Sequence, residues 1–432
     1  MPDQITKKML SLKDQYLIPC VYHFYRDPMV LERGEGCYLY DSEGKQYLDC
    51  YAGVGVTSCG HSNPQITRHT IAQIGKLQHT TTIYLTEPML LLAEKLAGFI
   101  QGPCNKSFFC SSGSEANEGA LLLSKLATGR GDFLALDRGL HGRTWLTAGV
   151  TGIEFWRTDP EPPQNIHFAP SPNCGNCPYK LEYPDCELHC AEEVGRILEK
   201  NTGKVAAMIA EPIHGNGGIV VPPEGYFKRV KEILDKHGVL LIMDEAQTGF
   251  CRTGKRFGFE QHGIQPEIIT VCKALGNGMP ISAFIATDEV AEKYTRPGSS
   301  TFGGNLVCAV TALAVLAYMQ EHQLEKAAEE KGLDLKAFLM SLQDRYTAIG
   351  DVRGKGLMLG VELVKPGGEP DAELMDNLLE NLKEKGFLVG KTGPGRNVLT
   401  LMPPLIISEM EISSLKTGLQ TAFEDFSLTE RN

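Results

Sequence analysis

Short apolar runs, separated by polar or glycine-rich turns, dominate the middle of the chain from about residue 60 to residue 305. Segments with the spacing of a helix lie between several of these runs, for example over residues 226–237. The runs read KVAAMIAEP, VLLIMDEA, IITVCKA and ISAFIAT. Strands that are apolar on both sides and alternate with helices are typical of a mostly parallel sheet covered on both faces. The pattern therefore predicts an α/β fold for this region.

The two ends of the chain show a different pattern. Residues 36–53 alternate around a turn at residues 42–44, which predicts short strands. After about Leu306 the chain becomes helical, and two strand-like runs, GLMLGVEL and NVLTLMPPL, flank a further helix. These features predict a smaller α+β domain. The predicted division has three parts: an N-terminal segment of the small domain at residues 1–60, the large domain at residues 61–305 and the C-terminal small domain at residues 306–432.

Charge and hydropathy exclude some classes of function. The net charge of −11 argues against a sequence-independent nucleic-acid binder, which needs a basic face. No run reaches the roughly 18 apolar residues of a membrane span, so no membrane partner is expected. The first residues, MPDQITKKMLSLKDQ, lack the apolar core of a signal peptide. We therefore expect a cytoplasmic protein whose 13 cysteines are mostly reduced thiols.

A phosphate-binding loop is the first candidate for chemistry. Residues 111–114 read Ser-Ser-Gly-Ser and lie between an apolar run and an amphipathic helical segment. Backbone N–H groups at the start of a helix, a permissive glycine and hydroxyl groups can hold a phosphate. The same residues also occur as an ordinary helix cap, so the loop alone does not decide.

Two charged residues follow predicted strands. Asp244 lies at the end of the run VLLIMDE, and Lys273 follows IITVC. The carboxyl end of a buried strand points into the crevice where α/β proteins bind ligands. A lysine there can lose its proton and attack an aldehyde. Pyridoxal phosphate needs a phosphate cradle, a carboxylate for its pyridinium nitrogen and a lysine for a Schiff base, so the three features together predict this cofactor.

The motifs that carry these residues resemble a known family. FFCSSGSEANEGALL, AEPIHGNGGIVVPPEGY, LLIMDEAQTGFCRTGK, VCKALGNGMPISAFIAT and STFGGN are similar to class III aminotransferases, which include the ornithine, 4-aminobutyrate and alanine–glyoxylate type-two enzymes. The resemblance covers nearly the whole chain. It implies the fold type I, aspartate aminotransferase-like architecture, with a large mostly parallel-sheet domain, a smaller α+β domain and a homodimer whose active sites lie at the interface.

The resemblance also assigns roles to matching positions. Lys273 would hold the cofactor as a Schiff base, Asp244 would pair with the pyridinium nitrogen, and Glu211 would orient groups around the aspartate and the substrate. The other expected cofactor-binding residues are Ser112, Gly113, Ser114, Leu140, His141, Gln247 and, from the neighbouring subunit, Thr301. Many relatives place an aromatic residue just before the His-Gly pair to cover the cofactor ring. Leu140 stands there in this chain, so either the leucine covers the ring or His141 takes part.

Two further departures concern the substrate. Ornithine-type relatives carry an arginine that grips a carboxylate where this chain has Thr400, and a glutamate where it has Asn216. We therefore expect an ω-amino acid or amine as amino donor and a small 2-oxo acid, such as pyruvate or glyoxylate, as acceptor in place of 2-oxoglutarate. Arg143, Arg26 and Arg396 are candidates for binding a substrate anion. Lyases and amino-acid epimerases on the same scaffold remain an alternative.

Four cysteines gather in one proline- and glycine-rich segment, SPNCGNCPYKLEYPDCELHC. Their spacing, at positions 174, 177, 186 and 190, would suit a tetrahedral zinc site. A loop of reduced thiols is the simpler interpretation, because a core of this size needs no structural metal. No metal is assigned to the active site, and the metal binding of Cys174, Cys177, Cys186 and Cys190 stays open.

Overall fold

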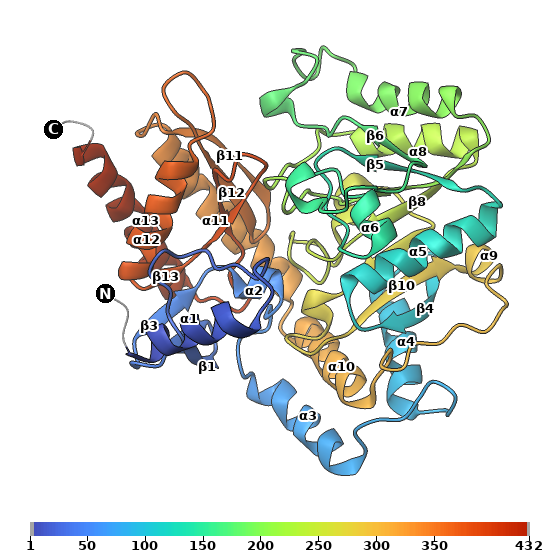
Figure 1. The fold of residues 1–432 in the computed structure, drawn as a ribbon, viewed down its shortest axis with the longest axis horizontal. Coiled ribbons are helices and arrows are strands. Elements are labelled where there is room, and N and C mark those ends of the chain that lie inside the picture. Colours follow the sequence, from blue (N-terminus) through green and yellow to red (C-terminus); the bar gives the residue numbers. More distant parts are fainter. Residues whose placement is uncertain (1–3, 430–432) are drawn as a thin grey trace.

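A seven-stranded sheet forms the centre of the larger part of the molecule in a computed structural model, which describes residues 4–429 (Figure 1). Its spatial order is β4 (Cys104–Cys110), β10 (Ser282–Thr287), β9 (Ile268–Val271), β8 (Leu240–Asp244), β7 (Val205–Ala210), β5 (Asp132–Leu136) and β6 (Ile166–Ala169). Only β10 runs antiparallel to its neighbours; the other paired strands are parallel. The predicted α/β fold is thus confirmed.

Helices cover both faces of this sheet, which explains why its strands are apolar on both sides. All residues of β7 and β9 are buried. On one face, Phe133 and Ala135 of β5 pack in a cluster with Ala120 and Leu121 of α5 (Gly113–Thr128). The opposite face belongs to a second cluster that includes residues of α7 (His189–Lys200) and α8 (Tyr226–His237). The two-sided burial matches the pattern of a parallel sheet.

Further helices complete the large part. α4 (Glu87–Ile100) packs against the edge strand β4, and α10 (Leu306–Glu321) packs against both α4 and α3 (Pro64–Lys76). The short helices of this part are α6 (Trp145–Gly149) and α9 (Asp288–Ala291). Within residues 4–429, no helix is long and apolar enough to cross a lipid bilayer.

Two smaller sheets lie on the other side of the molecule (Figure 1). One is antiparallel, in the order β11 (Ile349–Lys355), β12 (Met358–Leu363), β15 (Val398–Leu401) and β14 (Gly390–Thr392). The other joins β1 (Leu31–Glu35), β2 (Tyr38–Asp41) and β3 (Gln46–Asp49) to β13 (Phe387–Leu388), so the two ends of the chain share a sheet. The helices of this side are α1 (Gln4–Tyr16), α2 (Ala52–Gly55), α11 (Leu324–Gln343), α12 (Ala372–Glu384) and α13 (Glu409–Thr429). The domain limits at residues 60 and 305 remain a prediction.

A fully buried arginine, Arg252, connects the part of the molecule around the large sheet with the part that contains the two smaller sheets. Arg252 Nη1 donates to the carbonyl oxygens of Leu357 at 2.9 Å and Pro403 at 2.6 Å, and its Nη2 donates to Ser58 Oγ at 3.0 Å. Burial lowers the pKa of Arg252 to about 10. Since burying a charge is costly without hydrogen bonds, these three acceptors are needed to keep the guanidinium inside. The contacts fix the N-terminal and C-terminal segments against the loop that follows β8.

Candidate active site

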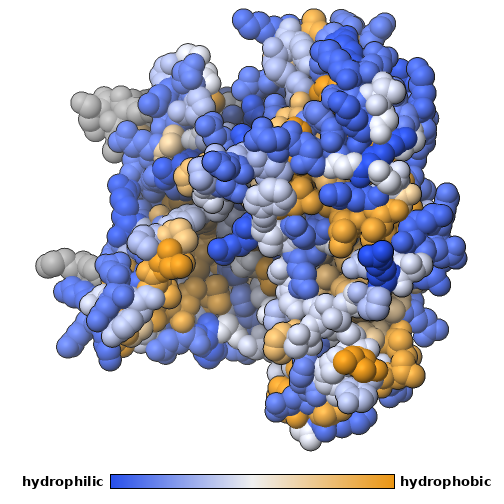
Figure 2. All heavy atoms as spheres, turned by 45° about the vertical axis from the view of Figure 1, so that its right-hand side comes forward, coloured by the Kyte–Doolittle hydropathy of each residue, from blue (hydrophilic) through white to orange (hydrophobic). Residues whose placement is uncertain are grey.

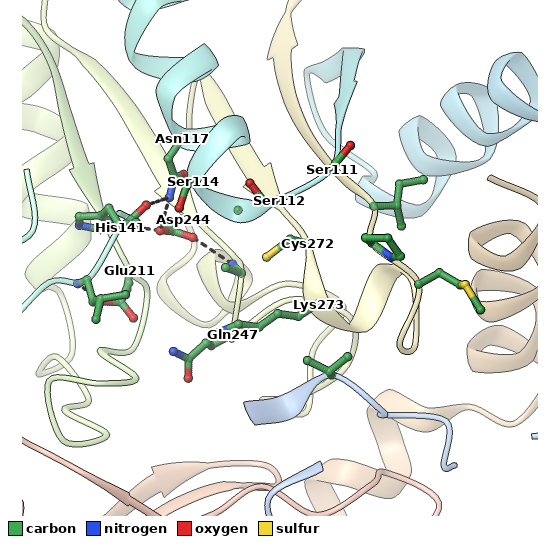
Figure 3. A pocket seen from close by; sticks show the side chains of 18 of the residues that line it. Ser111, Ser112, Ser114, Asn117, His141, Glu211, Asp244, Gln247, Cys272 and Lys273 are labelled. Carbon is green, nitrogen blue, oxygen red and sulfur yellow. Dashed lines mark hydrogen bonds and ion pairs between the residues drawn. The ribbon is translucent and has the colours of Figure 1, made fainter. Parts of the chain in front are cut away.

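A cavity of about 390 Å³ opens where several strands of the large sheet end (Figure 3). Segments that follow the carboxyl ends of β4, β5, β7, β8 and β9 all contribute to its wall. This is the edge at which α/β sheets bind ligands. The wall residues include Ser112, Gly113, Ser114, Leu140, His141, Glu211, Asp244, Gln247 and Lys273. The structure therefore brings together every predicted site residue except Thr301.

Lys273 follows β9 and projects into the cavity (Figure 3). Its backbone lies in the left-handed region, with a φ of 48°, which is unusual for a residue with a side chain and is characteristic of functional sites. Burial disfavours the ammonium form and lowers the pKa of Lys273. The nearby Cys272, Asp244 and Glu211 act in the opposite direction, but more weakly. The lysine thus has a larger share of free amine at neutral pH than a solvated lysine, as attack on an aldehyde requires.

The Asp244 carboxylate is the most heavily hydrogen-bonded group of the site. Its Oδ2 lies 2.9 Å from His141 Nδ1 and accepts a hydrogen bond from Asn117 Nδ2 at 2.8 Å (Figure 3). Its Oδ1 accepts from the Ala246 N–H at 3.1 Å. Asn117 is oriented in turn by Thr270, whose hydroxyl donates to Asn117 Oδ1 at 2.5 Å. Asp244 is therefore held in one orientation at the cavity wall, as pairing with a cationic ring nitrogen requires.

The predicted phosphate cradle forms the N-terminus of α5. Ser112 is the cap residue, and its Oγ accepts from the Glu115 N–H at 3.2 Å. Ser114 Oγ accepts from the Arg143 N–H at 3.1 Å, which fixes the neighbouring loop. Gly113 lies so close to Cys272 that a Cβ at residue 113 would be 3.0 Å from the sulfur. N–H groups at the start of a 16-residue helix and the close approach allowed by glycine suit a phosphate.

Glu211 connects two loops around the cavity. Its Oε1 accepts from the Leu140 N–H and its Oε2 from the Gly215 N–H, both at 2.9 Å. Burial alone would raise the pKa of Glu211, but His214, His141 and the Gly215 N–H favour the carboxylate, and the pKa lies below its ordinary value. A carboxylate that receives two backbone N–H groups is a fixed anchor for both loops.

Leu140, His141 and Gln247 take different positions around the cavity. Leu140 lines the wall, whereas the His141 ring is buried and directed at Asp244. His141 thus contacts the Asp244 carboxylate, and which of the two residues covers the cofactor ring stays a prediction. Gln247 fits against Gly215, where a Cβ would come within 2.3 Å of its Oε1.

Thr301 is exposed and stands outside this cavity of its own subunit. Its contribution to a neighbouring subunit stays a prediction. One site residue was not expected from the sequence: Asn117, which donates a hydrogen bond to Asp244. Cys272, for which a small core or near-site role was expected, packs against Gly113 of the phosphate loop. Asn117 could have been suspected, since it is a polar residue on the apolar face of α5, between Ala116 and Ala120.

The four clustered cysteines lie away from this site. Cys174, Cys177, Cys186 and Cys190 surround one narrow cavity together with His189. Burial and the neighbouring thiols raise the pKa of Cys190 to about 11, so this thiol stays protonated at neutral pH. In the part of the chain that the structure describes, no three His, Cys, Asp or Glu side chains are arranged to hold a metal ion.

Comparisons with known proteins agree with this geometry. The family model described as aminotransferase class-III matches residues 22–423. An Arabidopsis thaliana protein named alanine–glyoxylate aminotransferase 2 homolog 2, mitochondrial, is 39% identical over 98% of this chain and 87% of its own. A leucine/methionine racemase from Thermococcus litoralis is 38% identical over 92% of this chain and 91% of its own.

Solved structures give the same result. A Bacillus anthracis aminotransferase superimposes with a TM-score of 0.92 at 33% identity, covering 98% of this chain and all 100% of that one. An amine transaminase from an uncultivated Pseudomonas species, solved in its PLP-bound form, gives 0.90 at 29% identity, covering 95% of this chain and 98% of that one. An Arthrobacter phospholyase in complex with phosphoethanolamine gives 0.90 at 30% identity, with coverages of 96% and 99%.

The fold and the site thus define a fold type I enzyme that uses pyridoxal phosphate. Within that class, the chain belongs to the class III aminotransferase family. The residues present fit the cofactor: Lys273 has an amine to link it, Asp244 has a fixed carboxylate for its ring nitrogen and the N-terminus of α5 suits its phosphate.

The contact between Gly113 and Cys272 gives a testable consequence. We expect Gly113→Ala to raise the dissociation constant for pyridoxal phosphate about tenfold, because the added methyl group overpacks the floor of the phosphate loop. Removing the sulfur in the double variant Gly113→Ala/Cys272→Ala should restore most of the affinity, with Cys272→Ala alone as the control. Fluorescence titration of the cofactor-free protein measures all three. Unchanged affinity in Gly113→Ala would contradict the assignment of this loop.

Proposed function

We propose that the protein transfers an amino group from an ω-amino acid or amine to a small 2-oxo acid, with pyruvate or glyoxylate favoured over 2-oxoglutarate. The observation that carries this proposal is the buried position of Thr400. Its side chain is 0% exposed and its Oγ1 lies 2.7 Å from that of Thr392, which lines the cavity next to the site. A buried threonine cannot bind the second carboxylate of an acceptor such as 2-oxoglutarate in the two-point way that an arginine can.

A second cavity, of about 660 Å³, adjoins the first and is the proposed place for the substrate. The two cavities share Ser114, Leu140 and Gly142. Aromatic residues make up much of the second wall: Tyr22, Phe24, Tyr51, Phe155 and Trp156. A mostly apolar wall with a few charged groups favours a substrate that has a hydrocarbon part and one anionic end.

Arg143 is the best candidate for the group that binds this anionic end. It lines the second cavity, and the structure shows no ion pair for its guanidinium among residues 4–429. Arg396 also lines the cavity, but its Nη2 lies 3.3 Å from Asp376 Oδ2. Arg26 donates to Asn377 Oδ1 at 2.7 Å, and its side chain is engaged outside the cavity. An unpaired guanidinium offers a carboxylate two parallel donors without breaking an existing pair.

Pyridoxal phosphate supplies the electron sink that lets a bond next to the amino group break. Asp244, which His141 and Asn117 hold in one orientation, would stabilise positive charge at the ring nitrogen. Lys273 Nζ, with its lowered pKa, would accept the proton from the substrate carbon and deliver it to the cofactor carbon that had carried the aldehyde. Glu211 holds the loops that carry Leu140 and Gly215 and so keeps the wall of the site in place.

A lyase or an epimerase is the second candidate function. A racemase and a phospholyase are among the similar proteins, and both kinds of chemistry can start at the same lysine. The unpaired Arg143 would suit a phosphate or a carboxylate equally well. The reaction products therefore have to discriminate between the candidates.

We also propose a homodimer with active sites at its interface. Large apolar side chains are exposed on α3, on α4, on the segment between them and just before α10, among them Ile71, Ile83, Tyr84, Leu85, Leu91 and Phe302. Figure 2 shows apolar atoms on the lower lobe of the molecule, where Figure 1 places α3, α4 and α10. Exposed apolar surface of this extent supports burial by a second copy. A cytoplasmic location stays a prediction, since the Arabidopsis relative is named as mitochondrial.

The proposed reaction predicts a half-reaction that needs no 2-oxo acid. Adding an ω-amino acid alone should convert the lysine-linked cofactor to its aminated form, and adding pyruvate or glyoxylate should restore the starting spectrum. Absorbance spectroscopy with analysis of the released products tests this. Release of ammonia or phosphate with return of the starting spectrum, in the absence of any 2-oxo acid, would identify a lyase instead.

The proposed role of Arg143 predicts that its loss changes KM for amino donors that carry a carboxylate but not for amines that lack one. Arg143→Gln should raise KM for an ω-amino acid roughly tenfold or more, because a charge-assisted pair with the carboxylate is lost. KM for a neutral-ended amine such as benzylamine should change little. Arg396→Gln serves as the matched control, since this arginine already has Asp376. Equal losses for both donors, or a larger effect in Arg396→Gln, would contradict the assignment.

A further inference from the structure

Glu115, in the first turn of α5, holds two separate segments with its two carboxylate oxygens. Its Oε2 accepts from the Ser111 N–H at 2.9 Å. Its Oε1 accepts from the hydroxyl of Ser300 at 2.8 Å, and Ser300 is 185 positions away along the chain. Charge-assisted hydrogen bonds of this length are among the stronger polar contacts in proteins. Neither bond is part of the cofactor chemistry described above.

Each end of this link belongs to a different part of a cofactor site. Ser111 opens the phosphate loop that continues through Gly113. Ser300 immediately precedes Thr301, the exposed residue expected to reach the phosphate in the partner subunit. Ser300 Oγ also accepts from the Gly303 N–H at 3.2 Å, so the turn that carries Thr301 is built on this serine.

The turn is anchored to the sheet at its far end, Gly303. A Cβ at Gly303 would lie 2.1 Å from the carbonyl oxygen of Phe109, so the backbone rests directly on the end of β4. The ring of Phe302 lies 5.1 Å from that of His79 and is 61% exposed. Thr301 is exposed and lies between Ser300 and this anchored end of the turn. Its orientation depends on Ser300 and, through Ser300, on Glu115.

We propose that Glu115 and Ser300 couple the two cofactor sites of the dimer, so that pyridoxal phosphate binds cooperatively. Phosphate bound at residues 112–114 of one subunit fixes the position of Ser111 and, through Glu115, that of Ser300 at the start of the turn. The turn then presents Thr301 to the phosphate in the partner subunit and so raises the affinity of the second site. This inference rests on the proposed homodimer and on the proposed contribution of Thr301.

The coupling has to be reciprocal, since each subunit has the same link. Couplings between sites are typically worth roughly five- to hundredfold in affinity. A factor of about tenfold would give a Hill coefficient between 1 and 2 for two sites per dimer. Glu115 and Ser300 are thus positioning residues, which act through Thr301 and the phosphate loop.

The test is a titration of cofactor-free, full-length dimer with pyridoxal phosphate, followed by absorbance of the lysine-linked cofactor. The wild-type protein should give a Hill coefficient clearly above 1. Ser300→Ala should reduce it to about 1 and weaken the second binding step. Ser299→Ala is the matched control, because Ser299 is the exposed neighbour in the same turn, and it should behave as the wild type. Ser300→Thr, which keeps the hydroxyl, should retain cooperativity if Ser300→Ala proves poorly folded.

A double-variant cycle decides whether the link acts through Thr301. If it does, Ser300→Ala/Thr301→Val should bind the cofactor no more weakly than Thr301→Val alone. Hydrogen exchange of residues 298–304 should slow when inorganic phosphate is added to the wild type, but not to Ser300→Ala. A wild-type Hill coefficient of 1, or additive losses in the cycle, would overturn the coupling while leaving the lysine linkage intact. Absence of any lysine-linked absorbance would instead overturn the proposed function.

Discussion

The buried carboxylate of Asp244 is the constraint on which the site depends. It is 3% exposed at the end of β8, where an unpaired charge would be strongly destabilising. Its pairing with His141 and Asn117 fixes the loop after β5 and the first turns of α5, and Asn117 is held by Thr270 of β9. One carboxylate thereby sets the distances between the ring-nitrogen site, the phosphate loop and the segment that leads to Lys273. Because each partner comes from a different strand or helix, the site forms only when the sheet has formed.

The hydrogen bonds of Arg252 bring segments from both ends of the chain to the cavity. Arg252 holds Ser58 from the N-terminal segment and the carbonyl groups of Leu357 and Pro403 from the C-terminal part. Close to these contacts, Val56 lines the cofactor cavity, and residues 22–24 and 391–393 line the adjoining one. The substrate side of the enzyme is thus built from sequence-distant segments, whereas the cofactor side comes mainly from strand ends.

Features that depend on residues close together in the chain could be predicted from the sequence. The apolar runs marked the strands of the large sheet, and the helix expected over residues 226–237 has the bounds of α8. Lys273 and Asp244 could be predicted because each lies at the carboxyl end of a strand, and all such ends meet at one edge of a parallel sheet. Asn117 holding Asp244, the fit of Gly113 against Cys272 and the link from Glu115 to Ser300 could not be predicted. They join residues far apart in the chain, and their geometry is decided by tertiary packing.

The most direct test of the account is chemical trapping of the cofactor on its lysine. Borohydride reduction of the purified holoenzyme, followed by peptide mass spectrometry, should place the reduced cofactor on Lys273 alone. Lys273→Ala should lose both the modified peptide and the lysine-linked absorbance. The control variant Lys255→Ala should keep both, because Lys255 is an exposed lysine in the loop after β8. Modification of a different lysine, or an unchanged absorbance in Lys273→Ala, would contradict the central assignment.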